Sequence, residues 1–184
     1  MVHNKVVMVT GAAQGIGRAT AEKFLAQGWQ VLAIDQQAEG LASLQSAMPN
    51  RVATLVLDVT GQDAPAEAMA LVKQRFGRLD ALINNAGIGK SKAVHETTDA
   101  ELDQFYAINL RSVFRFSREA LGLLEPGMVV HFIKMFDLRF FGGDLGLFCF
   151  KLLSGGLEVA LAYLKIVVCR FELFFQSSLD LFHV

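Results

Sequence analysis

Hydrophobic and polar positions alternate along the first 127 residues between short apolar runs and longer amphipathic stretches. The short runs have the length and β-branched content of strands buried on both faces, and the longer stretches have helical spacing. The expected strands are 5–10, 30–34, 51–57, 79–83 and 128–133, and the expected helices are 16–26, 39–48, 65–76 and 98–121. This order predicts an α/β fold, a doubly wound parallel sheet covered by helices with right-handed crossovers.

Local signals mark where these elements begin and end. Gly28 stands where a helix C-terminal cap is expected, and Pro65 falls in a first helical turn, where its missing N–H costs nothing. Thr98 and Glu101 have the spacing of a capping box, which predicts that the long helix begins there. The Glu-Pro-Gly sequence at 125–127 predicts a turn before the fifth strand.

Composition and charge narrow the class of protein. With 184 residues, 53% hydrophobic and 19% charged, residues 1–184 are expected to form a single folded domain and not a disordered chain. A net charge of -1 argues against a nucleic-acid binder. Cys149 and Cys169 form neither a metal-binding spacing nor a disulfide framework, and no signal peptide is visible. A cytoplasmic protein without a metal site is therefore expected.

The composition changes near Gly127. Only five of the 15 phenylalanines precede this residue. Within the apolar stretch that follows, 157–168 predicts a helix, and 135–148, which has no clear period, predicts a loop. Charged side chains leave no uncharged apolar run of about 18 residues, so no bilayer span is expected; they are Lys151, Glu158, Lys165, Arg170 and Glu172. Residues 128–184 are thus treated apart from 1–127.

A glycine cluster lies between the first strand and the first helix. A dinucleotide pyrophosphate needs backbone N–H groups at a helix N-terminus and no side chain in its way. The first glycine permits a tight turn, the second a close approach of the pyrophosphate, and the third close packing of helix on strand. The candidate cofactor-binding residues of this turn are Gly11, Gln14, Gly15, Ile16 and Gly17.

Asp35 ends the second strand and is the candidate for recognition of the adenine ribose. A carboxylate at this position accepts hydrogen bonds from the ribose hydroxyls and repels a 2′-phosphate. Gln36 and Gln37 follow it, so no basic side chain comes next. This pattern favours NAD over NADP. The alternative is that Asp35 is an ordinary solvated residue at a strand end.

The spacing Gly11-x-x-x-Gly15-x-Gly17 resembles the short-chain dehydrogenase/reductase family, and the resemblance implies a Rossmann-like fold. Three further motifs in chain order match it: the pair Asp58-Val59, the sequence Asn84-Asn85-Ala86-Gly87, and the helix residue Asn109. The resemblance implies that the first motif contacts adenine, that the second shapes the cofactor floor, and that Asn109 joins a catalytic proton relay. Taken singly, each has an alternative: a loop cap, a turn, and a polar residue on a helix face.

The same family uses a tyrosine, a lysine four residues later and a serine for hydride transfer between the nicotinamide and an alcohol or ketone carbon. Tyr106 is followed at the fourth position by Leu110, and Tyr163 by Val167, so Tyr-x-x-x-Lys is absent from the sequence. A loose alignment puts Phe150 in place of the tyrosine and Ser154 in place of the lysine. Neither side chain can transfer a proton or supply a charge in that role.

The family's serine-rich segment is also replaced after the fifth strand. Lys134 and Asp137 stand there, and they are interpreted as loop residues without a chemical role. The chain ends before the Pro-Gly turn and last strand of the family, so the fold is expected to be incomplete at its C-terminus. Three hypotheses stay open: a frameshifted, truncated or altered oxidoreductase; divergence into a non-catalytic binding protein; and relocated catalytic residues.

The resulting expectation is an NAD-binding protein that resembles a short-chain oxidoreductase of alcohols or ketones and is inactive as written. The alternative is a non-catalytic NAD-binding sensor or scaffold, or an oligomerising interaction module. The expected partners are NAD(H) and a small alcohol or ketone, with neither nucleic acid nor a membrane. The family resemblance adds homo-oligomers that pair through the long helices. The substrate itself has no recognisable determinant in the sequence.

Overall fold

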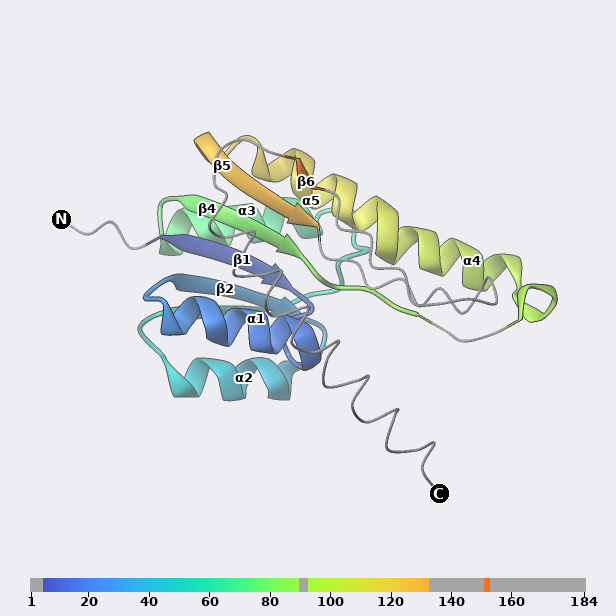
Figure 1. The fold of residues 1–184 in the computed structure, drawn as a ribbon, viewed down its shortest axis with the longest axis horizontal. Helices are drawn as coiled ribbons and strands as arrows, with labels where there is room; N and C mark the ends of the chain where they lie inside the picture. Colours follow the sequence, from blue (N-terminus) through green and yellow to red (C-terminus); the bar gives the residue numbers. More distant parts are fainter. Residues whose placement is uncertain (1–4, 90–92, 133–150, 153–184) are drawn as a thin grey trace, which may run out of the picture.

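The computed structural model describes residues 5–89, 93–132 and 151–152, and in these ranges strands and helices alternate as an α/β fold requires (Figure 1). In the first half, the elements are β1 (Val6–Thr10), α1 (Gly15–Ala26), β2 (Gln30–Asp35), α2 (Ala38–Ala47), β3 (Val52–Val56), α3 (Ala64–Arg75) and β4 (Leu79–Asn84). They are followed by η1 (Val94–Glu96), α4 (Asp99–Tyr106), the π-helical turn η2 (Ala107–Arg111), α5 (Ser112–Ala120), β5 (Leu124–Phe132) and β6 (Lys151–Leu152).

The strands form one sheet in the order β3-β2-β1-β4-β5-β6. All pairs from β3 to β5 are parallel, which confirms the doubly wound α/β prediction. Strand order reverses between β1 and β4, and in such sheets ligands bind beyond the carboxyl ends of the strands at that reversal. The arrowheads of the strands point toward the end of the molecule where α4 and η1 project (Figure 1).

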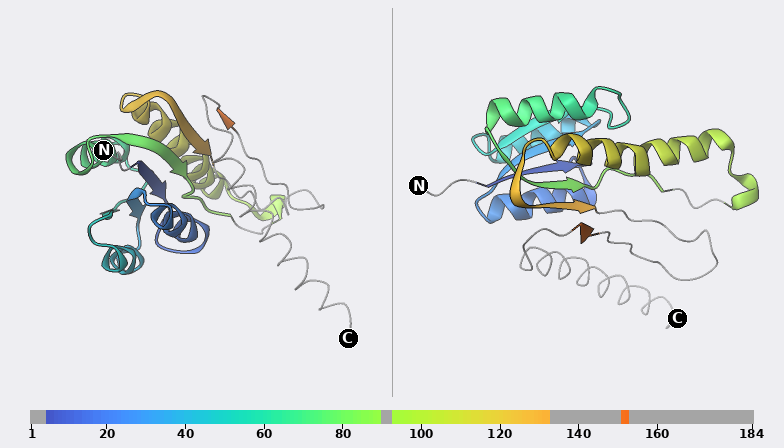
Figure 2. Two further views of the ribbon diagram at one scale, coloured as in Figure 1. Left: turned by 60° about the vertical axis from the view of Figure 1, so that its left-hand side comes forward. Right: turned by 90° about the horizontal axis from the view of Figure 1, so that it is seen from above.

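Helices cover both faces of the sheet. Figure 2 shows α1 and α2 on one face and α3 with the α4–α5 helix on the other. Val7 and Val9 of β1 pack with the α1 and α2 side, whereas Val6 and Met8 pack with α3 and α5, because successive strand side chains point to opposite faces. Burying each such side chain contributes about 1.5–3 kcal/mol, so the two apolar layers hold the helices to the sheet.

The local signals at helix ends are confirmed. Gly28 follows α1 with a φ of +87°, a left-handed conformation that suits glycine. Pro65 lies in the first turn of α3. At the start of α4, the Glu101 N–H donates to Thr98 Oγ1 at 3.3 Å and the Thr98 N–H donates to Glu101 Oε2 at 3.0 Å, which completes the expected capping box.

The expected turn at 125–127 and the expected start of the fifth strand at 128 are wrong. The turn at 125–127 lies inside β5, which begins four residues before the expected start at 128. Pairing with β4 passes from Leu79–Leu124 to Ala81–Val129, so the extra residues around the proline are accommodated as an irregularity within the strand instead of ending it. The sheet also continues past β5 into β6, which is antiparallel and was not expected.

The helix expected at 98–121 is divided by the π-helical turn η2 into α4 and α5. The expected helix at 157–168 and loop at 135–148, together with Lys134, Asp137, Phe150, Ser154 and Tyr163, lie outside the described residues. Within the described ranges, no helix is both long enough and apolar enough to cross a membrane. The same part of the chain contains no group of three metal-ligating side chains.

Candidate nucleotide site

The loop between β1 and α1 is closely packed on its inner side and open on its outer side. A Cβ atom on Gly11, whose φ is +68°, would lie 2.7 Å from Asn85 Nδ2 and 2.9 Å from Ala86 Cα. A Cβ atom on Gly17 would collide with the Gly11 carbonyl oxygen. A Cβ atom on Gly15, whose φ is +56°, would meet nothing within 4 Å. The glycine that the sequence assigns to cofactor approach thus faces open space, and the other two pack against the fold.

The N-terminus of α1 is next to this open side. Gln14 is the N-cap residue, is exposed, and makes no side-chain capping hydrogen bond. Gly15 is exposed and Ile16 is half-buried, and the first turn of the helix contains no acidic side chain. No acidic side chain of this first turn neutralises the positive end of the α1 helix dipole. The N-terminus of α1 therefore favours binding of an anion such as a pyrophosphate.

Asp35 is bonded to the glycine loop and is not simply a solvated residue at a strand end. Its Oδ2 accepts the Ala13 N–H at 3.0 Å and its Oδ1 accepts the Gln37 N–H at 3.1 Å. Helix α2 packs closely against Ala13, since a Cβ on Gly40 would lie 2.6 Å from the Ala13 carbonyl oxygen. The hydrogen bonds from the Ala13 and Gln37 N–H groups hold the half-buried Asp35 carboxylate beside the glycine loop.

The Asn85-Ala86-Gly87 segment is joined to the first strand by a network centred on Thr10. Asn85 Nδ2 donates to the carbonyl oxygens of Thr10 and Gly11 at 3.0 and 3.1 Å. The N–H groups of Asn85 and Ala86 both donate to Thr10 Oγ1 at 3.0 Å. Gly87 is exposed beyond them. The segment predicted to shape the cofactor floor therefore lies against the glycine loop, although the two are more than 70 residues apart in sequence.

The neighbouring Asn84 has a different, internal role. It is 2% exposed, and its Nδ2 donates to Ser117 Oγ at 3.2 Å, while that hydroxyl donates to the Val113 carbonyl oxygen at 2.7 Å. These bonds join the end of β4 to α5. Thus the two asparagines of the motif point to different partners: Asn84 to the helix layer and Asn85 to the glycine loop.

Asp58 and Val59 follow β3 and differ in environment. Asp58 is exposed, and its Oδ1 accepts both the N–H and the hydroxyl of Thr60, at 2.9 and 2.8 Å, as a loop cap does. Val59 is 5% exposed and belongs to the core on the α3 side. Arg115 of α5 also reaches this loop, with its Nη1 3.5 Å from the Thr60 carbonyl oxygen. These contacts show that Asp58 caps the loop after β3. Contact of Asp58 with adenine stays a prediction of the family resemblance.

Asn109 is 3% exposed and lies within η2. Its Nδ2 donates to the Ile88 carbonyl oxygen at 2.8 Å, and its Oδ1 accepts the Ile88 N–H at 3.1 Å. One side chain thus satisfies both backbone groups of a residue in the loop after β4. The sequence placed Asn109 on the long helix but did not reveal this pairing or the π-helical turn that presents it.

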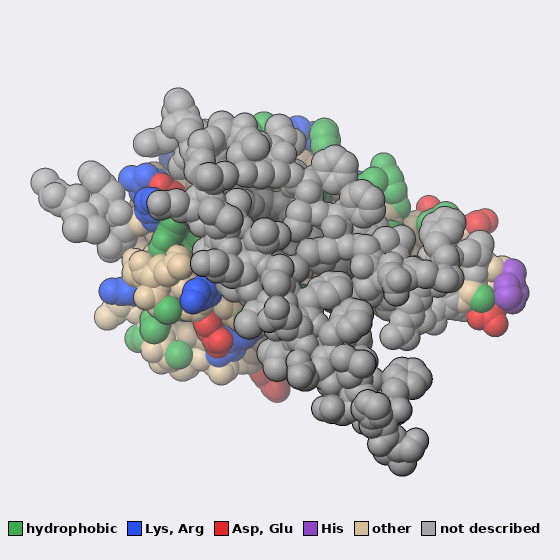
Figure 3. Space-filling model, viewed as in Figure 1, with side chains coloured by type: hydrophobic (Ala, Val, Ile, Leu, Met, Phe, Trp, Pro, Cys, Tyr) green, Lys and Arg blue, Asp and Glu red, His purple; other side chains and the backbone are tan. Residues whose placement is uncertain are grey.

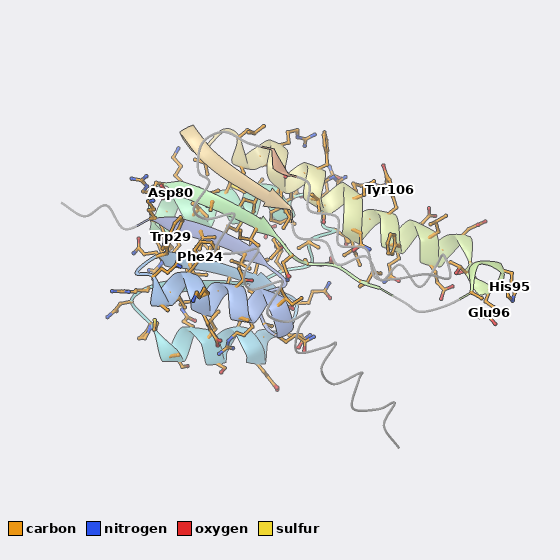
Figure 4. The ribbon with its side chains drawn as sticks, in the orientation of Figure 1. Phe24, Trp29, Asp80, His95, Glu96 and Tyr106 are labelled. Carbon is orange, nitrogen blue, oxygen red and sulfur yellow. The ribbon has the colours of Figure 1, made fainter. Side chains whose placement is uncertain are left out.

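The tyrosine within the described part of the chain lies away from this loop. In Figure 4, Tyr106 stands on the outer side of α4, and His95 and Glu96, which belong to η1, lie at the far end. Tyr106 is 47% exposed, and the Arg111 guanidinium lies 5.1 Å from the centre of its ring. Its surroundings are a solvent-facing helix surface and not the carboxyl edge of β1 and β4.

Several residues that build the site were not singled out from the sequence. Five of them join segments distant in the chain: Thr10, Ala13, Gly40, Ile88 and Ser117. The sixth, Ser112, bonds to Ile108 within its own helix. The one available sequence signal was the position of Thr10 directly before Gly11. On the face shown in Figure 3, basic and acidic side chains are mixed over α1 and α2, in keeping with the net charge of -1.

Comparison with known proteins gives a consistent picture. A sequence model described as short chain dehydrogenase matches residues 5–132. The chain is 36% identical over 152 residues to levodione reductase of Leifsonia aquatica, covering 78% of this chain and 57% of that protein. It is 34% identical over 164 residues to a 3beta-hydroxysteroid dehydrogenase of Mediterraneibacter gnavus, covering 86% of this chain and 59% of the relative.

Solved structures resemble the fold as well. A short-chain dehydrogenase/reductase from Brucella melitensis, described as a glucose/ribitol dehydrogenase, superposes with a TM-score of 0.67 at 35% identity, covering 70% of this chain and 55% of the other. A 3-ketoacyl-(acyl-carrier-protein) reductase from the same organism, in complex with NADH, gives a TM-score of 0.63 at 26% identity, covering 67% and 51%. The chain thus spans little more than half the length of these similar proteins.

Proposed function

The chain belongs to the short-chain dehydrogenase family, and from this premise we propose that it binds NAD(H) across the glycine loop at the carboxyl ends of β1 and β4. The observation that carries the proposal is the loop itself: closed at Gly11 and Gly17, open at Gly15, and flanked by the Asp35 carboxylate. Isothermal titration of the full chain with NAD⁺ and NADH tests it, and absence of binding to either would reject it.

The preference for NAD over NADP rests on Asp35. A 2′-phosphate at the adenine ribose would place about two negative charges beside a fixed carboxylate, with Gln36 and Gln37 next in the chain. Because the Ala13 N–H holds the carboxylate in place, the side chain has little freedom to move aside. We therefore expect NADH to bind more tightly than NADPH in the same titration.

For the chemistry, we propose the family's reaction type, oxidation of an alcohol or reduction of a ketone. The bound nicotinamide would supply or accept the hydride. The residues that this chain contributes are the loop that binds the dinucleotide and Asn109, which holds the loop after β4 through Ile88.

For the 184-residue chain itself, we propose binding with little or no turnover. Its sequence contains no Tyr-x-x-x-Lys, and Tyr106 lies on the outer surface of α4. A panel of secondary alcohols with NAD⁺ and of ketones with NADH, followed by absorbance of the reduced nicotinamide, tests this part. Robust turnover would reject the inactivity and leave the binding proposal standing.

A second function is favoured by a row of exposed apolar side chains on the α4–α5 helix. Leu102, Tyr106, Leu110 and Phe114 are spaced by four residues and are 59%, 47%, 51% and 64% exposed. Monomeric proteins seldom leave such a row uncovered. We propose that this face pairs with a second copy of the chain. Light scattering after size exclusion would detect the dimer, and a monomer at all concentrations would reject it.

We also propose a cytoplasmic location, which suits a protein with two cysteines in no disulfide framework. Cell fractionation with antibody detection tests the proposal. Recovery in a secreted or membrane fraction would contradict it.

A further inference from the structure

The π-helical turn η2 has an unusual hydrogen-bonding arrangement at its end. The N–H of Ser112 donates to the carbonyl oxygen of Ala107, five residues earlier. In an α-helix this N–H would donate to Ile108, four residues earlier. Such turns are rare and occur often at functional sites. The backbone here therefore adopts the wider of two competing registers.

The side chain of Ser112 occupies the position that the backbone N–H leaves. Its hydroxyl donates to the Ile108 carbonyl oxygen at 2.5 Å, and the residue is 4% exposed. One residue thus provides both bonds: its N–H makes the π bond to Ala107, and its hydroxyl takes the Ile108 carbonyl that the α register would give to that N–H. The Ile108 carbonyl therefore keeps a hydrogen-bond donor while the backbone N–H bonds Ala107.

The register matters because η2 contains Asn109. Asn109 bonds to both backbone groups of Ile88, at 2.8 and 3.1 Å. Ile88 follows directly after the 85–87 segment, whose first residue is bonded to Thr10 and Gly11. A return to the α register would change the direction of Asn109 relative to this loop, since each helical register sets its own angular position for the side chains that follow.

We propose that Ser112 is a positioning residue that holds η2 in the π register and so keeps Asn109 on Ile88 beside the nucleotide site. The proposal deepens the proposed function, on which it rests for its effect on the cofactor. The register itself can be tested without ligand, so failure of NAD(H) binding and failure of the Ser112 role are separate results.

The first test uses the unmutated full chain. Through-hydrogen-bond scalar couplings in the NMR spectrum identify which carbonyl accepts each N–H. A coupling between the Ser112 nitrogen and the Ala107 carbonyl carbon is expected, and a coupling to Ile108 instead would overturn the proposal. This measurement does not depend on any variant folding.

The second test compares Ser112→Ala with Ser112→Thr, which retains the hydroxyl. Without the hydroxyl, hydrogen exchange of the Ile88 amide is expected to rise roughly three- to tenfold relative to the Val7 amide in β1, and threonine is expected to restore it. The matched control is Ser46→Ala, which removes a similar hydroxyl bond to a carbonyl four residues earlier, the Ala42 oxygen at 2.8 Å in α2. It is expected to leave the Ile88 amide unchanged.

Equal changes at Ile88 and Val7 in Ser112→Ala would show a general loss of stability and would overturn the positioning role. No change at Ile88 would overturn it as well. If the unmutated chain binds NADH, Ser112→Ala is expected to lower the affinity and Ser112→Thr to retain it. If the unmutated chain binds no NAD(H), the proposed function fails, and the exchange and coupling results still decide the role of Ser112.

Discussion

The Asp35 carboxylate accepts the backbone N–H of Ala13 at 3.0 Å, so the end of β2 is bonded to the loop that leads into α1. Asp35 ends β2 and Ala13 lies in the loop after β1, and the carboxyl ends of these two neighbouring parallel strands lie side by side. This bond fixes the position of the carboxylate to which we assign the choice between NAD and NADP. A substitution that keeps an acceptor for the Ala13 N–H can therefore test the negative charge of Asp35 separately from this hydrogen bond.

Asp35→Asn retains one oxygen, which can accept the Ala13 N–H; it loses the acceptor of the Gln37 N–H and removes the negative charge. We expect affinity for NADPH to rise about tenfold relative to NADH, because a charge facing a 2′-phosphate at about 5 Å near a protein surface is worth on the order of 1–3 kcal/mol. Titration with both dinucleotides measures the ratio. Asp63→Asn, an exposed carboxylate before α3, is the control; an equal shift there would mean that only net charge matters.

Gly15 and Gly77 form a matched pair. Both have positive φ, +56° and +74°, and a Cβ on either would meet nothing within 4 Å. Alanine at either position is expected to lower the free energy of unfolding by about 1–2 kcal/mol, since both become strained in the same way. Only Gly15→Ala is expected to weaken NADH binding, because its methyl group enters the open side of the loop. Equal affinities of the two variants would refute the placement of the cofactor.

Gly17→Ala should destabilise the fold even though alanine is normally the better helix former. The added Cβ would collide with the Gly11 carbonyl oxygen and lie 2.5 Å from Asn85 Nδ2. Overpacking of this kind typically costs about 1–3 kcal/mol, which exceeds the gain of about 1 kcal/mol from helix propensity. Chemical denaturation measures the difference, and a more stable variant would contradict this packing.

Asp80 is expected to stabilise the fold without acting on the cofactor. Its Oδ2 accepts the Val6 N–H and Arg78 Nε, both at 2.8 Å, at the amino ends of β1 and β4. Asp80→Ala should lower the free energy of unfolding by about 1–3 kcal/mol, because the Val6 N–H loses its acceptor in a partly buried position. Glu119→Ala, which breaks the exposed pair with Arg118, should change it by less than about 1 kcal/mol.

NADH affinity should be unchanged in Asp80→Ala once the protein is folded. Asp80 lies at the amino ends of β1 and β4 (Figure 4), whereas the glycine loop follows the carboxyl end of β1. A selective loss of affinity at full folding would contradict the separation of the two ends of the sheet. The measurement is a titration below the unfolding transition.

Phe114→Glu tests the pairing face on the α4–α5 helix. Phe114 is 64% exposed, so a carboxylate at this position places charge where apolar contact is expected. We expect the dimer to dissociate at least tenfold more readily, measured by light scattering over a dilution series. Val56→Glu, at another exposed apolar position, is the control and should leave the dimer intact.

Much of the fold follows from local pattern. The run from residue 5 to Thr10 predicts a buried strand because each residue must face an apolar layer on either side of a parallel sheet, and all of β1 is buried. Helices start and stop at Pro65, Thr98 and Gly28 because these residues change the local backbone options by themselves. The glycine turn is similarly local, since its spacing between a strand and a helix already points to a phosphate-binding loop.

The contacts that assemble the candidate site are not local. Asn85 reaches Thr10 and Asn109 reaches Ile88 only after β1, β4 and the long helix have come together. No periodicity in the sequence encodes which of two adjacent asparagines faces the glycine loop. Strand order places β4 beside β1, and because these strands are adjacent, Asn85 can hydrogen-bond to Thr10.

By itself, the sequence determined the alternation of strands and helices, their approximate ends, and the glycine loop with Asp35 beyond it, because apolar periodicity, capping and glycine conformations act over a few residues. Only the tertiary structure decided the π register at Ser112, the irregular pairing of β5 around Pro126 and the bond from Asp35 to Ala13. The β5 pairing and the Asp35–Ala13 bond depend on segments that are distant in the sequence and meet only in the folded sheet. The π register depends on which of two carbonyl groups the Ser112 N–H bonds, and hydrophobic periodicity does not distinguish the two.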